Sequence, residues 1–199
     1  MNKKRNRRSL FKPSTDEINK YARQYDKCAT LQDKEIEKEM KALLLIQRWI
    51  CKHELIKIAQ WKARGRIDYL CDKNTPEEVK EISRKALAAN TDRDRMETLR
   101  ELDGVDYPMA SVILHFAFPN KYPILDRRAI WSLHSWLLHS EKPPSIYSFK
   151  CWKEYCGKIL CISKSTGCTI REIDKALWQY SKEKQRKGCS RHVRTREAG

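Results

Sequence analysis

The sequence predicts an all-α fold, on three observations. Apolar residues recur at helical spacing along most of the chain, no alternating strand pattern persists, and capping residues stand where several helices should begin. With 199 residues and 40% hydrophobic content, the chain is long enough to bury one core. We therefore expect one helical domain at residues 15–183, between a basic disordered arm at 1–14 and a basic tail at 184–199.

Capping and turn residues predict where the helices begin and end. Thr75 before Pro76 is a helix start, because proline is tolerated in the first turn. Gly167 ends one helix, and Thr169 with Glu172 forms a capping box for the last. In order, the expected helices span about 15–28, 33–61 (with a break near 51–53), 75–90, 92–102, 107–118, 126–139, 147–163 and 169–183; residues 62–66 are expected to form a basic loop.

A tight turn joins two of these helices near residue 104. Gly104 stands where a helix end needs positive φ, Val105 supplies an apolar contact, and Asp106 can cap the next helix ahead of Pro108. So short a connection predicts a helix-hairpin-helix at about 92–118. The backbone N–H groups of such a turn can hold a phosphate.

A single acid, Asp126, opens the helix that follows the hairpin. It comes after the extended segment 123–125 and before an amphipathic run. Taken alone, Asp126 is interpreted as the N-cap of that helix.

Together, the hairpin and Asp126 resemble the helix-hairpin-helix superfamily of DNA glycosylases over residues 75–138. The 18 positions from Pro108 to Asp126 fit the family spacing. The resemblance implies a two-lobed helical glycosylase fold with Asp126 as the catalytic carboxylate. The residues that carry it are Leu102, Gly104, Val105, Ala110, Phe118, Pro123 and Asp126.

The chain also departs from that family pattern. Asp106 replaces the second hairpin glycine, and Pro108 occupies the position of the Schiff-base lysine of bifunctional members. The resemblance therefore implies base removal without the lyase step. Residues 127–130 differ from the residues that usually follow the catalytic Asp.

The charge of the chain predicts a polyanionic partner. Lys and Arg outnumber Asp and Glu by 42 to 26, giving a net charge of +16. No apolar run is long enough to span a membrane, and the basic N-terminus lacks the apolar segment of a secretory signal. We expect a cytoplasmic monomer that binds double-stranded DNA and no membrane, with its eight cysteines reduced.

Metals and cofactors are not expected. Cys151, Cys156, Cys161 and Cys168 fall where many family members hold an iron–sulfur cluster, but their spacing differs from that of the cluster ligands. Small buried thiols are the alternative interpretation. The five histidines show no zinc-binding spacing.

Basic and aromatic residues near these motifs are candidates for binding DNA and an extruded base. Each basic residue has the alternative of being a solvated surface charge, and most aromatics the alternative of belonging to the core. Candidates for DNA contact are Gly104, Val105, Asp106, Arg64, Arg66, Lys121, Arg127 and Arg128; candidates for the base pocket are Tyr107, Tyr122, His115 and Trp61.

These residues predict a monofunctional DNA glycosylase that flips out a damaged or modified base and hydrolyses its N-glycosidic bond. The Asp126 carboxylate would stabilise positive charge on the sugar. The target is a repair lesion or a modified base of phage DNA, the latter implying antiviral defence. Two alternatives stay open: a non-catalytic helix-hairpin-helix DNA-binding protein, in which Asp126 is only a cap, and a basic RNA-binding protein.

Overall fold

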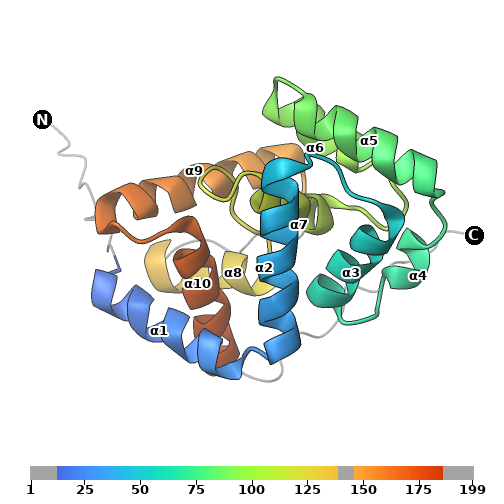
Figure 1. Ribbon diagram of the computed structural model, residues 1–199. Coiled ribbons are helices and arrows are strands. Elements are labelled where there is room, and N and C mark those ends of the chain that lie inside the picture. Colours follow the sequence, from blue (N-terminus) through green and yellow to red (C-terminus); the bar gives the residue numbers. More distant parts are fainter. Residues whose placement is uncertain (1–12, 139–145, 186–199) are drawn as a thin grey trace, which may run out of the picture.

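The computed structural model describes residues 13–138 and 146–185, and every regular element within them is helical (Figure 1). The all-α prediction is confirmed. The helices are α1 (Thr15–Cys28), α2 (Leu31–Ile46), α3 (Lys52–Ala63), α4 (Asp68–Cys71), α5 (Pro76–Ala88), α6 (Asp92–Leu99), α7 (Tyr107–Ala117), α8 (Arg127–Ser132), the π-helical segment η1 (Leu133–Leu138), α9 (Phe149–Thr166) and α10 (Ile170–Lys184).

The helices pack in two groups. In one group, α10 lies against α1, α8 and α9, so the first and last described helices are neighbours (Figure 1). In the other group, α7 packs against α2, α3 and α6, α3 packs against α4 and α5, and α5 packs against α6. Ion pairs from α2 to α10 and from α3 to the N-cap residue of α8 join the two groups, and both belong to the site described below.

Helix α7 is the centre of the core. All of its residues except Pro108 are buried, so the helix is enclosed on every side rather than along one apolar face. Ser111 and His115 are its fully buried polar residues, and each hydrogen-bonds to the loop that follows the helix. The i, i+3, i+4, i+7 spacing of Met109, Val112, Ile113 and Phe116 by itself indicates only one buried face.

Capping side chains explain several helix starts. Thr75, Thr91 and Thr169 accept hydrogen bonds from the backbone of the first turns of α5, α6 and α10. The cap of α1 is Ser14, one residue before the predicted start at Thr15. Gly167 adopts a φ of 74° at the end of α9, as its predicted helix-breaking role requires.

Several predicted boundaries were wrong. The break in the 33–61 helix lies at residues 47–51, and the predicted 62–66 loop begins only after Ala63, followed by the short, unpredicted α4. The helix after Asp126 is α-helical only to Ser132 and then widens to a π-helix. Trp136 of this segment stacks on Tyr180 at 4.5 Å, a tertiary contact that apolar periodicity does not reveal.

No helix among the described residues is long and apolar enough to cross a membrane. Most of the predicted arm (1–12), most of the predicted tail (186–199) and residues 139–145 lie outside the described residues.

Candidate active site

Asp126 lies at the end of an extended loop that two buried side chains hold. The Leu125 N–H donates to the Ser111 hydroxyl of α7 at 2.8 Å, and the Ile124 N–H donates to Asp174 of α10 at 2.8 Å. Asp126 then begins α8 as its N-cap, accepting from the Arg128 N–H at 2.8 Å. The predicted capping role of Asp126 is confirmed.

The other carboxylate oxygen of Asp126 faces α3. Lys62 Nζ lies 3.0 Å from Asp126 Oδ2 and also donates to the Leu125 carbonyl at 3.1 Å. The Lys62 side chain is 12% exposed and that of Asp126 is 26% exposed. Burial by itself would raise the pKa of Asp126, but the Lys62 ammonium and the Arg128 N–H together lower it below its usual value. Asp126 is therefore an ionised carboxylate that solvent still reaches.

A cavity of about 90 Å³ opens beside this ion pair. Aromatic side chains from three helices form much of its wall, with both groups of helices contributing. Its volume is below the ~300–1,000 Å³ usual for ligand pockets. The lining residues are Tyr25, Asp33, Trp61, Lys62, Arg64, Ile124, Asp126, Ala129, Arg171, Asp174 and Trp178.

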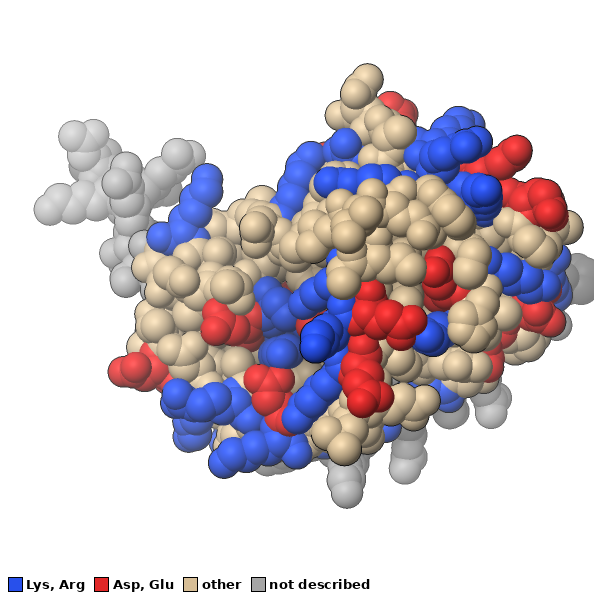
Figure 2. All heavy atoms as spheres, in the orientation of Figure 1, with Lys and Arg blue, Asp and Glu red and all other residues tan. Residues whose placement is uncertain are grey.

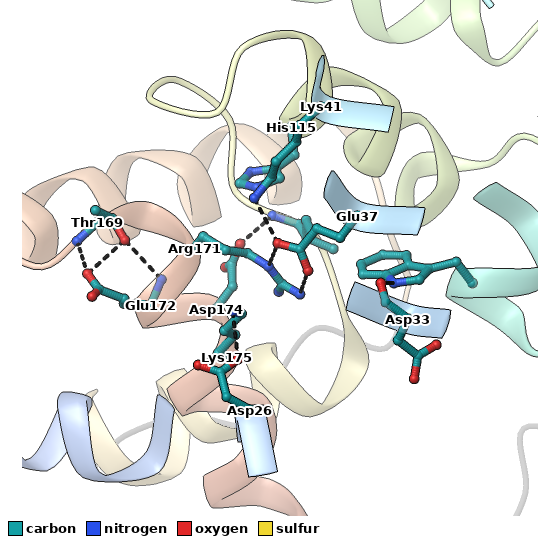
Figure 3. A network of polar contacts seen from close by, with 12 residues as sticks. Asp26, Asp33, Glu37, Lys41, His115, Thr169, Arg171, Glu172, Asp174 and Lys175 are labelled. Carbon is teal, nitrogen blue, oxygen red and sulfur yellow. Dashed lines mark hydrogen bonds and ion pairs between the residues drawn. The ribbon is translucent and has the colours of Figure 1, made fainter. Parts of the chain in front are cut away.

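A buried ion pair lies against the cavity. Figure 3 shows Arg171 of α10 pointing toward Glu37 of α2, where two N–H···O contacts measure 2.8 Å each. The Arg171 guanidinium also lies 5.3 Å from the ring centre of Tyr25 and 5.6 Å from that of Trp61. Burial alone would raise the pKa of Glu37, but Arg171 and Lys41 hold it well below its usual range. Arg171 thus links Glu37 to two aromatic residues of the cavity wall.

Asp174 is a second carboxyl in the same wall. Besides the Ile124 N–H, it accepts from the Tyr155 hydroxyl at 3.0 Å, and it is only 3% exposed. Burial raises the pKa of Asp174 to about 7. The cavity therefore contains one carboxylate held ionised and one carboxyl that titrates near neutrality, a separation often found where acid and base roles differ.

No protein-family model matches the chain, and no curated protein matches it. Among solved structures, the fold is similar to that of Methanocaldococcus jannaschii 8-oxoguanine glycosylase/lyase, crystallised with a 15-mer DNA containing 8-oxoguanine. The two chains are 18% identical, with a TM-score of 0.45, over 83% of this chain and 78% of the other.

One of the four predicted base-pocket residues, Trp61, lines the cavity. Its indole N–H donates to the Asp33 carbonyl at 3.1 Å. The structure places the other three in the core, outside the lining. Tyr107 donates to Glu97, Tyr122 donates to Asp92, and the His115 ring nitrogen Nδ1 contacts the Tyr122 carbonyl at 2.8 Å.

The predicted basic contacts are divided between the cavity and other surfaces. Arg64 lines the cavity from a left-handed backbone position at the end of α3, and Arg128 lies 5.5 Å from the Trp178 ring centre. Burial and the nearby Asp126 carboxylate raise the pKa of Tyr147, and Arg127 opposes that shift, so Arg127 lies near both groups. Arg66 Nε instead donates to the Ala63 carbonyl at 3.0 Å. Lys121 is paired with Asp92 at 2.9 Å.

Basic residues are mixed with acids on the face drawn in Figure 2, with Lys and Arg interspersed among Asp and Glu. That face presents no single continuous basic patch. Terminal residues contribute much of the chain's charge: residues 1–12 contain six Lys and Arg and no acid.

The hairpin turn has the predicted geometry. Gly104 has a φ of 78°, and a Cβ there would lie 2.7 Å from the Cys71 Sγ. Val105 is buried, and the exposed Asp106 caps α7 by accepting from the Tyr107 N–H at 2.7 Å. The N–H groups of Asp103, Val105 and Tyr107 all donate within the protein, so a phosphate would have to use other donors of the turn.

Sequence reasoning missed eight of the eleven lining residues: Tyr25, Asp33, Lys62, Ile124, Ala129, Arg171, Asp174 and Trp178. Lys62 had been assigned to a loop, although it lies in the last turn of α3. Arg171 and Asp174 fall within a strongly amphipathic helix. A charged residue on the buried side of that helix was the one sequence signal that could have identified them as site residues. Nothing in the sequence indicates that positions 64 residues apart, Lys62 and Asp126, meet.

The cysteines of the described residues do not converge. Cys156 and Cys168 are buried, Cys151 is half-buried and Cys161 is exposed. No group of three or more Cys, His, Asp or Glu side chains within residues 13–138 and 146–185 is placed to hold a metal ion.

Proposed function

We propose that the protein is a DNA N-glycosylase in which Asp126 acts on the sugar of an extruded nucleotide. The observation that carries the proposal is an ionised, partly exposed Asp126 carboxylate beside an aromatic-walled cavity. A solvent-accessible anion in such a cavity suits a substrate that develops positive charge next to a flat ring.

The chemistry follows from the bond that breaks. When the N-glycosidic bond is cleaved, its electron pair leaves with the base, and positive charge develops at C1′ and the ring oxygen. The Asp126 carboxylate stabilises that charge, and water adds to C1′. Trp61, Tyr25 and Trp178 provide surfaces on which an extruded base can stack. Entry of a base requires the mouth of the cavity to widen.

The proposed substrate is duplex DNA, bound by a single copy of the protein. The net charge of +16 supplies the sequence-independent attraction, and the hairpin of α6 and α7 is the proposed contact with the strand. The hairpin contributes no amine, since Pro108 occupies the relevant position, so base removal itself proceeds by hydrolysis. A repair lesion or a modified phage base in the cytoplasm is the proposed target.

Replacing Asp126 by Asn tests this function. Asparagine is an equally good N-cap, so Asp126→Asn removes the charge while keeping α8 capped. We expect base release to fall by about 10²-fold or more. The assay incubates the protein with genomic DNAs that carry different base modifications, phage DNAs included, and measures alkali-labile breaks.

Asp72→Asn is the matched control, because Asp72 forms an exposed Asp–Lys pair with Lys52 at 2.9 Å, outside the cavity. Circular dichroism verifies that each variant is folded. Base release by Asp126→Asn at the wild-type rate would overturn the assignment. Binding of duplex DNA without abasic sites from any substrate would instead leave the non-catalytic DNA-binding alternative, which the capping role of Asp126 supports.

A further inference from the structure

The cavity contains one primary amine among the described residues that line it, that of Lys62. Its Nζ is 3.0 Å from Asp126 Oδ2, and the side chain is 12% exposed. Most lysines extend into solvent, so an enclosed ammonium at the wall of a cavity is unusual. The Leu125 carbonyl, 3.1 Å away, fixes Nζ from a second direction.

We infer that Lys62 is an amine nucleophile that attacks the sugar aldehyde left after base removal, forming a covalent imine with DNA. The inference rests on the proposed function, because the proposed function places the sugar beside Asp126. It assigns the amine to α3, outside the hairpin, whose Pro108 gave no reason to expect a covalent step.

The location of Lys62 supports this role. Base removal leaves a sugar that equilibrates with an open-chain aldehyde, and lysine amines condense with carbonyl groups. A sugar close enough for Asp126 to stabilise charge at C1′ brings that carbon near Nζ, because the two side chains touch. Lys121 and Lys153 both pair with Asp92, which does not line the cavity.

The step is balanced without an added oxidant or reductant. The Lys62 ammonium gives one proton to Asp126 Oδ2 through the existing hydrogen bond, and the free electron pair on Nζ forms a bond to C1′. The carbonyl oxygen takes that proton and, with a second proton from nitrogen, leaves as water. The protonated imine that results acidifies the C2′ proton, which passes to the Asp126 carboxylate. The electron pair of the C2′–H bond forms a C2′=C3′ bond, the C3′–O3′ bond breaks, and the phosphate leaves with that bond's electron pair.

Borohydride trapping tests the inference without knowledge of the excised base. The probe is a duplex oligonucleotide with one abasic site, prepared by enzymatic removal of uracil, and sodium borohydride reduces any imine to a stable amine. We expect a covalent protein–DNA adduct with the wild-type protein, and peptide mass spectrometry should place it on Lys62. Lys62→Gln and Lys62→Arg should lower its yield by about tenfold or more, since neither side chain forms an imine.

Lys57→Gln is the matched control, because Lys57 lies on the same helix and pairs at the surface with Glu39 at 2.9 Å. It should form as much adduct as the wild type. Undiminished trapping by Lys62→Gln, or an adduct mapped on the wild-type protein to another residue, would overturn the inference. Mapping requires no variant, so the test holds even if Lys62→Gln folds poorly.

The two proposals fail in different ways. Base release without trapping at Lys62 eliminates the covalent step and leaves the glycosylase. Trapping at Lys62 without base release from any DNA eliminates the glycosylase and leaves an amine that processes existing abasic sites.

Discussion

The Ser111 hydroxyl accepts a hydrogen bond from the Leu125 N–H at 2.8 Å, and this contact joins the second hairpin helix to the residue before Asp126. Ser111 is fully buried and donates its own proton to the Pro108 carbonyl at 2.7 Å. The hairpin and the candidate catalytic carboxylate are thus parts of one hydrogen-bonded unit.

Replacing Ser111 by Ala should therefore reduce both stability and activity. The Leu125 N–H would lose its partner in the interior, at a cost of about 1–3 kcal/mol in free energy of unfolding. Base release per folded molecule should also fall, because Asp126 would no longer be held. Urea denaturation and the alkali-labile break assay measure the two effects.

Ser83→Ala separates the two effects. Ser83 is equally buried and its hydroxyl accepts from the Ile50 N–H at 3.0 Å, but it does not line the cavity. The Ser83→Ala variant should lose as much free energy of unfolding as Ser111→Ala but release bases at the wild-type rate. Equal activity in the two variants would show that the Ser111 contact does not position Asp126.

The Asp174 carboxyl should make stability depend on pH. Its folded-state pKa of about 7 lies above the ordinary value of 3.8. Between those values the folded chain holds a proton that the unfolded chain releases, so stability falls as pH rises toward 7. Relative to Asp174→Asn, which does not titrate, the wild type should lose about 2.5 kcal/mol between pH 5 and pH 8.

Thermal denaturation of both proteins at the two pH values gives this difference. The comparison with Asp174→Asn is needed because the pH dependence of stability that His115 contributes has the opposite sign. Burial lowers the pKa of His115 to about 3, so its contribution is lost as pH falls below the ordinary value of 6.5. Parallel pH profiles for wild type and Asp174→Asn would refute the raised pKa.

Glu37→Gln should be strongly destabilising. It removes one partner of an ion pair whose side chains are 14% and 13% exposed, leaving the Arg171 charge without its carboxylate. The expected loss is about 3–5 kcal/mol, or a melting temperature about 10 °C lower. Glu39→Gln, at an exposed pair with Lys57, should cost below about 1 kcal/mol. Similar melting temperatures for the two variants would contradict the assigned burial.

Gly104→Ala should cost more than Gly167→Ala. Both glycines have φ near +75°, so both substitutions carry the backbone penalty of about 1–2 kcal/mol. A methyl group at position 104 meets Cys71, whereas position 167 has open space, so an additional ~1–3 kcal/mol is expected at 104. Chemical denaturation measures the free energy of unfolding of both variants. Equal losses would mean that α4 shifts to accommodate the methyl group at position 104.

Local signals explain which parts of the fold were predictable. Thr75, Thr169 and Gly167 act on residues within four positions, so their roles follow from sequence spacing. The Gly104 turn and the Asp126 cap were predictable for the same reason. The π-helical segment was not predictable from such local signals, because its Trp136 packs on Tyr180 of α10, which is distant in sequence.

The candidate site was predictable only for the residues next to a motif. Asp126, Arg64 and Trp61 were predicted and line the cavity, but Tyr107 and Tyr122 turn inward to partners on α6. Lys62, Arg171 and Asp174 reach the cavity through contacts between helices that are distant in sequence. Burial of a charged group depends on its distant partners, which composition and periodicity do not specify.

Trp61 and Trp178 stand in the cavity wall, so the protein carries two natural fluorophores at the place where a base would have to settle. Stacking on an indole alters its emission, so occupancy of the cavity can be followed by intrinsic fluorescence in real time, with no attached dye. Entry of the nucleotide can then be timed separately from the chemical step that follows it.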